Sequence, residues 1–560
     1  MNKVKSFFLS ILILFSPAFL YLSCSDSSDK GNDDCENEIQ IAEEEIFSLS
    51  DVNGKNIYAI ITNPSSQEIE GQYLRSITSV SGIEGLDTSE ENLTDTSNAD
   101  AKIIESSFTG YKIPVSVKDS LFTSDSCRSA SADQITQPEK ITEPIVDETA
   151  MKIYVDNDLS MQTYRKKAST LRAKGKYCYV WVVDSYYSEE EIDSDDVGNK
   201  VDSATAQALA DKFDSLYPVE RYLFGNESEN IFYNDSIYST MEEWSATGSM
   251  VNIVLYDIGC DRYSLYSKGV MGYFYDKDYY IPVKDGDLRY SNQGKYFYVD
   301  TYYAVKYADT MMSTLAHEFQ HMIAFGVEKQ ETEEVWYKEM LALHCEDALY
   351  EFLEIPQDAS PRYRLPSFNS HYVYSGIEYN TSEGSLSYAT LYAFGAWCAR
   401  NFGGAEYIKK VALCPYANEN AVVYAVNAYG NTDYSFEDIL NLYTQSLVNP
   451  DSDFTLNRAG DENLIYADGS VSYSYPLSAI DLSSADFHWT SSVLDPAYIT
   501  NECDEESEYI NPAVFSYGYM PEVLRPNGFI LLKLGTAQED NVSLTFSSGN
   551  AAEELHLLAY

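Results

Sequence analysis

Two histidines four residues apart are the side chains whose type and spacing point most directly to chemistry in this 560-residue chain. His317 and His321 lie between Asp309 and Gly326, a segment that begins and ends with residues favoured at helix termini. Residues four apart share one helix face, so the two imidazoles can bind one zinc ion at about 2.0 to 2.1 Å. Glu318 projects sideways and can act as the general base towards a metal-activated water.

A second predicted helix, Trp336 to Asp347, supplies a third ligand, Glu339, which lies 18 residues after His321. Two histidines and one glutamate form a donor set of catalytic zinc sites, which leaves one coordination position open. Glu346 lies two turns further on the same face, so it is the alternative ligand or a partner that orients a ligand. The expected cofactor is one Zn²⁺ ion. The chain has only 6 histidines, which makes a chance His-Glu-x-x-His pattern the weaker interpretation.

These segments resemble the hyicolysin-type metallopeptidases, within the wider group related to thermolysin. The resemblance rests on His317-Glu-Phe-Gln-His-Met-Ile, on Trp336-Tyr-Lys-Glu339 and on Ser291-Asn-Gln-Gly-Lys-Tyr-Phe-Tyr-Val-Asp300, and it covers roughly Lys176 to Leu447. It implies a zincin fold, in which a small sheet packs above the active-site helix and a mainly helical half closes the cleft below. It also implies zinc-dependent hydrolysis of peptide bonds in proteins or peptides.

A further tyrosine is implied by resemblance. The segment from Tyr388 to Gly404 is similar in spacing to the Tyr-to-Gly-Gly helix of thermolysin-related aminopeptidases, where the leading tyrosine stabilises the oxyanion. Tyr388 is therefore the expected catalytic hydrogen-bond donor, and ordinary burial among 49 tyrosines is the alternative. Leu343 departs from the thermolysin pattern, which has an acidic residue there, so the partner that orients the zinc-binding histidine is unassigned. The Gly-x-Met-Glu-Asn motif of the aminopeptidases is absent, which favours an endopeptidase.

The formal net charge of -51 bears on partners. Such an acidic surface repels the phosphates of nucleic acids and anionic lipids, so nucleic acid is not an expected partner. Cationic peptides would be attracted, although solubility alone also explains the charge. The acidic stretch from Ser188 to Asp196 hints at a Ca²⁺ loop through Asp193, Asp195 and Gly198, but Val197 stands where an oxygen ligand is expected. A solvated surface loop is the stronger interpretation.

The N-terminus has the features of an export signal. Lys3 and Lys5 precede an apolar run from Phe7 to Leu22, which is short for a membrane span and is followed by no basic stop-transfer residues. The segment resembles a bacterial lipoprotein signal in which Cys24 becomes the lipidated first residue. We therefore expect an exported protein, lipid-anchored to the bacterial cell envelope or surface, which meets the membrane through that anchor.

The expected fold class is α+β, with a zincin-like catalytic domain between two β-rich domains. Short alternating runs near both ends predict strands, and mixed helix and strand patterns occupy the middle. The expected divisions are a signal peptide at 1–23, a tether at 24–40, a β-rich domain at 41–150, the catalytic domain at 151–450 and a C-terminal β-rich domain at 451–560. A surface adhesin or binding protein with an inactive zincin-like domain is the alternative function.

Overall fold

The computed structural model describes residues 45–84, 111–112, 136–156, 164–189, 199–234, 236–258, 269–283, 286–380, 384–449, 451–469, 471–491, 494, 496–519, 521–547, 549 and 553–560. The chain divides into two compact units, 1–40 and 41–560, and all of the described residues belong to the second. Cys24 and the proposed calcium-loop residues Asp193, Asp195 and Gly198 lie outside the described residues. Within the described ranges, no helix is long and apolar enough to cross a membrane.

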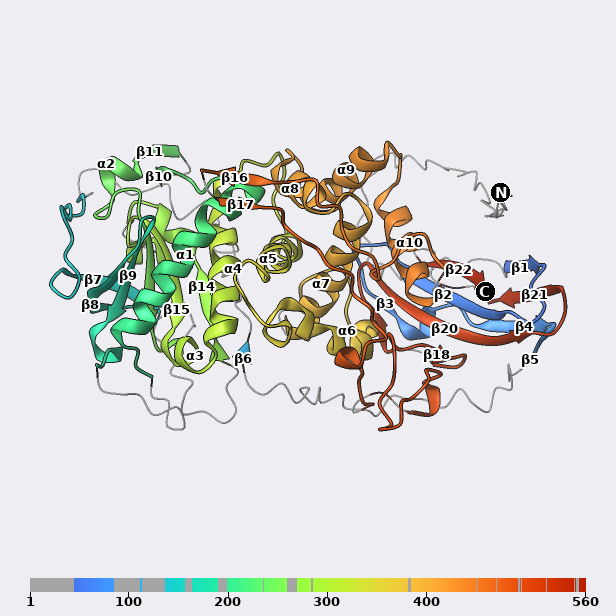
Figure 1. Ribbon diagram of the computed structural model, residues 1–560. Coiled ribbons are helices and arrows are strands. Elements are labelled where there is room, and N and C mark those ends of the chain that lie inside the picture. Colours follow the sequence, from blue (N-terminus) through green and yellow to red (C-terminus); the bar gives the residue numbers. More distant parts are fainter. Residues whose placement is uncertain are drawn as a thin grey trace, which may run out of the picture. The chain divides into compact units, whose positions relative to one another are not determined.

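The fold is a mixed α/β architecture built around a six-stranded sheet (Figure 1). In spatial order its strands are β14 (Gly272–Phe274), β15 (Lys295–Asp300), β12 (Val251–Tyr256), β9 (Cys178–Val183), β8 (Tyr164–Lys174) and β7 (Ala150–Asp156). The three central strands β15, β12 and β9 run parallel and are buried along their whole length. Continuous apolar runs are typical of parallel strands covered on both faces. Such runs predict all three strands, at Lys176 to Val183, Val251 to Tyr256 and Lys295 to Val299.

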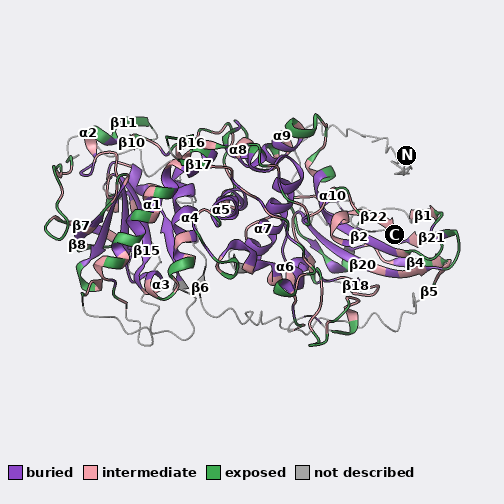
Figure 2. Ribbon diagram, viewed as in Figure 1, coloured by how far each residue is buried: buried purple, intermediate pink, exposed green. Residues whose placement is uncertain are grey.

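Side chains of the central strands alternate between two cores, one on each face of the sheet. On β15, Phe297 and Val299 belong to the main core, whereas Tyr296 and Tyr298 belong to a smaller, tyrosine-rich core. Because successive side chains point to opposite faces, the main core lies on the face that the helices cover. Figure 2 shows how the sheet and the adjacent helices are buried together.

Helices form two layers on the main-core face of the sheet. Helices α1 (Ser203–Phe224) and α4 (Ala308–Gly326) pack on the sheet, α5 (Val335–Leu349) packs on α4, and α7 (Gly384–Asn401) packs on α5. Phe213 of α1 and Phe319 of α4 meet edge to face, with ring centroids 5.0 Å apart. Helix α4 therefore lies between the sheet and the outer helices, with its apolar stripe facing the core.

Both predicted helices are present, but α4 begins before the predicted cap Asp309 and α5 begins one residue before Trp336. The N-cap of α4 is Tyr307 rather than Asp309, which lies in the first turn. The N-cap of α5 is Glu334, with no side-chain hydrogen bond to the helix. An acidic residue inside the first turn still stabilises a helix through the macrodipole, so Asp309 contributes without being the cap.

The regions on either side of this α/β core share sheets with each other. Strand β2 (Asn56–Asn63) lies between β20 (Gly528–Ala537) and β22 (Glu554–Ala559), and β21 (Asn541–Phe546) lies between β1 (Glu45–Ser50) and β4 (Ile77–Ser81). The predicted divisions at 150 and 450 stay predictions, but the first and last β-rich regions are joined by strand pairing. Such pairing between distant segments leaves no local sequence signal.

Shorter elements complete the described fold. The remaining helices are α2 (Met241–Trp244), α3 (Thr301–Lys306), α6 (Leu365–His371), α8 (Ala405–Leu413), α9 (Asn418–Gly430) and α10 (Phe436–Val448). The remaining strands are β3 (Ile69–Glu70), β5 (Ile83–Glu84), β6 (Tyr111–Lys112), β10 (Asn230–Tyr233), β11 (Ser236–Thr240), β13 (Gly269–Val270), β16 (Tyr466–Asp468), β17 (Val471–Tyr473), β18 (Phe515–Ser516) and β19 (Val523–Leu524).

Candidate metal centre

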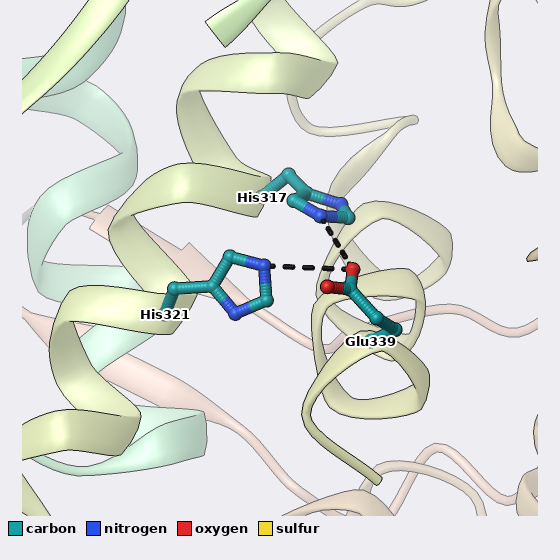
Figure 3. Close-up of side chains that lie close together, drawn as sticks. All are labelled: His317, His321 and Glu339. Atoms are coloured by element: carbon teal, nitrogen blue, oxygen red, sulfur yellow. Dashed lines mark ion pairs between the residues drawn. The ribbon is translucent and has the colours of Figure 1, made fainter. Parts of the chain in front are cut away.

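Two histidines of α4 and one glutamate of α5 meet between the two helices. His317 Nε2 lies 3.3 Å from Glu339 Oε2, and His321 Nε2 lies 3.6 Å from the same oxygen. Figure 3 shows both rings directed from α4 towards the Glu339 carboxylate on α5. All three residues are buried, and their ligand atoms lie within 4.8 Å of one another. The structure therefore brings together the three residues that the sequence selects.

The donor atoms at this centre fit a divalent cation. The Nε2 atoms of His317 and His321 are buried and make no hydrogen bond within the described part of the chain. A buried polar atom left without a partner costs about 1 to 3 kcal/mol, which a bound ion would remove. Two imidazole nitrogens and one carboxylate match a zinc site that keeps a position open for a water or substrate.

Charge within the centre depends on burial and on close neighbours. Burial alone would lower the pKa of His317, but its contacts with the Glu339 and Glu346 carboxylates raise it to about 10. Burial would raise the pKa of Glu339, whereas His321 and His317 hold it well below its usual range. Without a cation, His317 is therefore protonated at neutral pH and pairs with Glu339. A metal ion binding here must displace that proton.

Glu346 orients His317 from the side opposite Glu339. His317 Nδ1 lies 2.8 Å from Glu346 Oε1, and Ser313 Oγ donates to Glu346 Oε2 at 2.7 Å. Of the two roles that the sequence leaves open for Glu346, the structure gives it the orienting one. Leu343 cannot supply the carboxylate that thermolysin has at this position. Glu346, three residues further along α5, supplies one to His317 instead.

Glu318 lies beside the two histidines and is completely buried. Burial raises the pKa of its carboxyl group to about 8, with a smaller rise from the charge of Glu339 and an opposing effect from His317. Gly272 of strand β14 packs closely against Glu318. A Cβ added to Gly272 would lie 3.4 Å from Glu318 Cγ and 2.8 Å from the Tyr298 carbonyl oxygen. Only a residue without a side chain permits this approach.

Tyr388 of α7 lies at the edge of the centre. Its side chain is 1% exposed, and its ring centroid lies 6.1 Å from that of His317. Burial raises its pKa, and the charge of Glu339 raises it further. The sequence-predicted donor is thus near the metal ligands.

Sequence reasoning missed two neighbours of Tyr388. Arg364 is 3% exposed, lies over the Tyr388 ring at 5.6 Å from its centroid, and has Nη2 3.9 Å from Glu346 Oε1. The ring of Tyr379 packs edge to face on Tyr388, with centroids 5.7 Å apart. Both residues lie outside α4, α5 and α7. Helical spacing in the sequence therefore gives no indication that they are near the centre.

A second group of metal-ligating side chains lies far along the sequence from this centre. His488, Asp504 and Glu508 have ligand atoms within 4.8 Å of one another and are partly exposed. His488 Nδ1 bonds Asp504 Oδ2 at 3.0 Å, and its Nε2 bonds the Ser483 carbonyl oxygen at 3.0 Å. An ion pair with both ring nitrogens satisfied accounts for this geometry, so the group differs from the buried centre.

Comparison with known proteins agrees with the geometry of the centre. No family model matches the chain. Over 296 residues the chain is 25% identical to the neutral metalloprotease ShpI of Staphylococcus hyicus, a match that covers 50% of this chain and 59% of that protein. The chain therefore spans less than two thirds of the length of this curated relative. The likeness supports a distant relationship between this chain and the metalloproteases.

Proposed function

We propose that this protein is a zinc-dependent endopeptidase that hydrolyses peptide bonds of extracellular proteins. The observation that carries the proposal is the buried meeting of two imidazole Nε2 atoms with the Glu339 carboxylate, beside the Glu318 carboxyl group. The likeness to a neutral metalloprotease supports it. The six-stranded sheet packed on α4, with helices on the far side, supports a zincin-like arrangement of the region 151–450.

His317, His321 and Glu339 would hold the ion, and Glu346 would keep His317 Nε2 directed at it. When bound, zinc supplies a Lewis acid that polarises a carbonyl oxygen and lowers the pKa of a water to about 7. A protein ligand set with one carboxylate leaves net positive charge at the ion. With an ion held there, the pKa of Glu318 would fall from its cation-free value and its carboxylate would be available as a base.

Glu318 moves the proton in this mechanism. As the water oxygen bonds to the peptide carbonyl carbon, Glu318 accepts the water proton. It returns that proton to the amide nitrogen as the carbon–nitrogen bond breaks, so the first products are one carboxylic acid and one amine, and the acid then gives its proton to the amine. Tyr388 donates a hydrogen bond to the carbonyl oxygen while negative charge develops on it. Burial of Glu318 and Tyr388 excludes bulk water from both steps.

An adhesin or binding protein with an inactive zincin-like domain is the alternative, and the observations favour it less. The relative is a metalloprotease, and the metal ligands, the base and the orienting Glu346 are all present. We further propose that the protein is exported and lipid-anchored through Cys24. Metabolic labelling with a palmitate analogue should mark the wild type and not Cys24→Ala.

Metal analysis with a proteolysis assay tests the proposed function. Purified protein should contain one zinc ion per chain and digest casein. A chelator should abolish digestion, and added zinc should restore it. Protein that binds no zinc, or casein digestion that a chelator does not affect, would refute the proposal.

A further inference from the structure

A short loop brings a second tyrosine to the metal centre. Residues 375–380 join the 3-10 turn Tyr372–Tyr374 to the segment that leads into α7, and Tyr379 lies near the end of this loop. Its ring meets the Tyr388 ring at 86°, with centroids 5.7 Å apart. The Tyr388 ring in turn lies 6.1 Å from the His317 ring. The three rings form a continuous row that starts at a metal ligand.

The two tyrosines differ in how far substrate can reach them. Tyr388 is 1% exposed, whereas Tyr379 is only partly buried. Burial raises the pKa of Tyr379, and the charge of Glu339 is the next cause, so its phenol lies within the field of the metal ligand. A hydrogen bond with Tyr388 opposes part of that rise. Tyr379 is therefore the more exposed phenol of the row.

The C-terminal β region holds the Tyr379 loop in place. A Cβ on Gly376 would lie 1.7 Å from the Pro526 carbonyl oxygen, so the loop packs directly on the turn that precedes β20. The Ile377 N–H donates to the Asn527 carbonyl oxygen at 3.4 Å, and the Asn380 N–H donates to Ser387 Oγ at 3.0 Å. Backbone contacts at both ends of the loop thus fix where Tyr379 lies.

We propose that Tyr379 is a catalytic residue that touches the substrate: its partly exposed phenol, packed on Tyr388, donates a hydrogen bond to the scissile carbonyl oxygen. This inference rests on the proposed peptidase function. Tyr379 acts only as a hydrogen-bond donor and transfers no proton in this step. The bond strengthens as the oxygen gains negative charge, and Tyr379 and Tyr388 act together on that oxygen.

Tyr379→Phe tests the proposal because it removes one hydroxyl and keeps the ring. The expected result is a fall in kcat of about 10²-fold with little change in KM, since the lost bond is made mainly in the transition state. Affinity for a peptide phosphonate, a stable mimic of the transition state, should fall by a similar factor in calorimetry. Zinc content and Tm should equal those of the wild type.

Tyr374→Phe is the matched control. Tyr374 is also partly exposed and precedes the same loop, but its hydroxyl lies 3.4 Å from that of Tyr519, in the C-terminal region. It should retain wild-type kcat and phosphonate affinity. If Tyr379→Phe keeps both values within about twofold, or loses them only together with zinc or folding, the inference is wrong. A wild-type protein without chelator-sensitive cleavage would instead refute the peptidase function on which the inference rests.

Discussion

Glu318 combines complete burial with a position between the two histidines that are proposed to bind the metal. Replacing it by Gln removes the base but keeps the shape and the ligands. We expect Glu318→Gln to lower kcat by about 10²- to 10⁴-fold while the protein still binds one zinc ion. Peptide-cleavage kinetics and metal analysis check this. Glu328 is exposed and follows α4, so Glu328→Gln is the control and should remain fully active. If Glu318→Gln were equally active, another group would have to take the proton.

Protons and zinc compete for His317. In the metal-free protein its pKa is raised from 6.5 to about 10, so the folded state binds an extra proton between these values. That proton stabilises the metal-free fold fully below pH 6.5, and the stabilisation disappears as pH rises through about 10. Zinc binding at pH 7 should therefore release about two protons per ion, one from His317 and most of one from Glu318, whose cation-free pKa is about 8. Calorimetry in buffers of different ionisation enthalpy measures the release in the wild type and in Glu318→Gln, which should release about one proton. No release from that variant would mean that His317 is already neutral.

The sequence identifies the site residues that share one face of a helix, but it does not identify the site residues outside the long helices. His317, His321 and Glu339 were predictable because helical spacing fixes which side chains share a face, and the structure brings them together. Arg364 reaches the centre from the end of a short 3-10 turn, Pro361–Arg364, and Tyr379 reaches it from a loop. Neither segment is long enough to show a helical periodicity in the sequence. Their positions follow only from how the surrounding elements pack.

Helices α4 and α5 are joined by a carboxylate as well as by apolar packing. Glu346 of α5 accepts from Ser313 of α4 and bonds His317 Nδ1. Glu346→Gln keeps the size of the side chain but removes the charge. We expect zinc affinity to fall about 10- to 100-fold, because the imidazole becomes less basic and less fixed. Competition with a chromogenic chelator measures the affinity.

Glu351, a nearby exposed carboxylate, provides the control for Glu346→Gln. Glu351 follows α5 and is exposed to solvent, so Glu351→Gln should bind zinc as tightly as the wild type. If Glu346→Gln did the same, the hydrogen bond to His317 would contribute nothing to metal binding. Both variants should unfold near the wild-type temperature when loaded with zinc.

Element boundaries follow the sequence most closely where burial is continuous. The strand predicted at Val251 to Tyr256 is β12, and the observed β15 extends its predicted range by one residue. Helix caps were less predictable, because an acidic residue such as Asp309 also stabilises a helix from inside its first turn. A residue type that favours the N-cap therefore indicates that a helix begins nearby, but it does not identify the first helical residue.

At the scale of the molecule, strands from both ends of the chain form one sheet around β2. Seven of its eight residues are buried, and β20 and β22 pair with its two edges. A chain that ends at residue 527 lacks both partners, so we expect it to stay insoluble or unfolded, as judged by circular dichroism and proteolysis. A chain that begins at residue 41 should fold with an unchanged Tm. A cooperative unfolding transition in the chain ending at 527 would contradict this expectation.

Strand pairing between the two ends also orders events during synthesis. The ribosome releases the turn at Pro526, β20 and β22 after α4, α5 and the Tyr379 loop. Until that turn emerges, the Tyr379 loop lacks the backbone that packs on Gly376. If the protein has the proposed peptidase function, its site would be complete only after this region is made, which would protect the cell that makes it from premature cleavage.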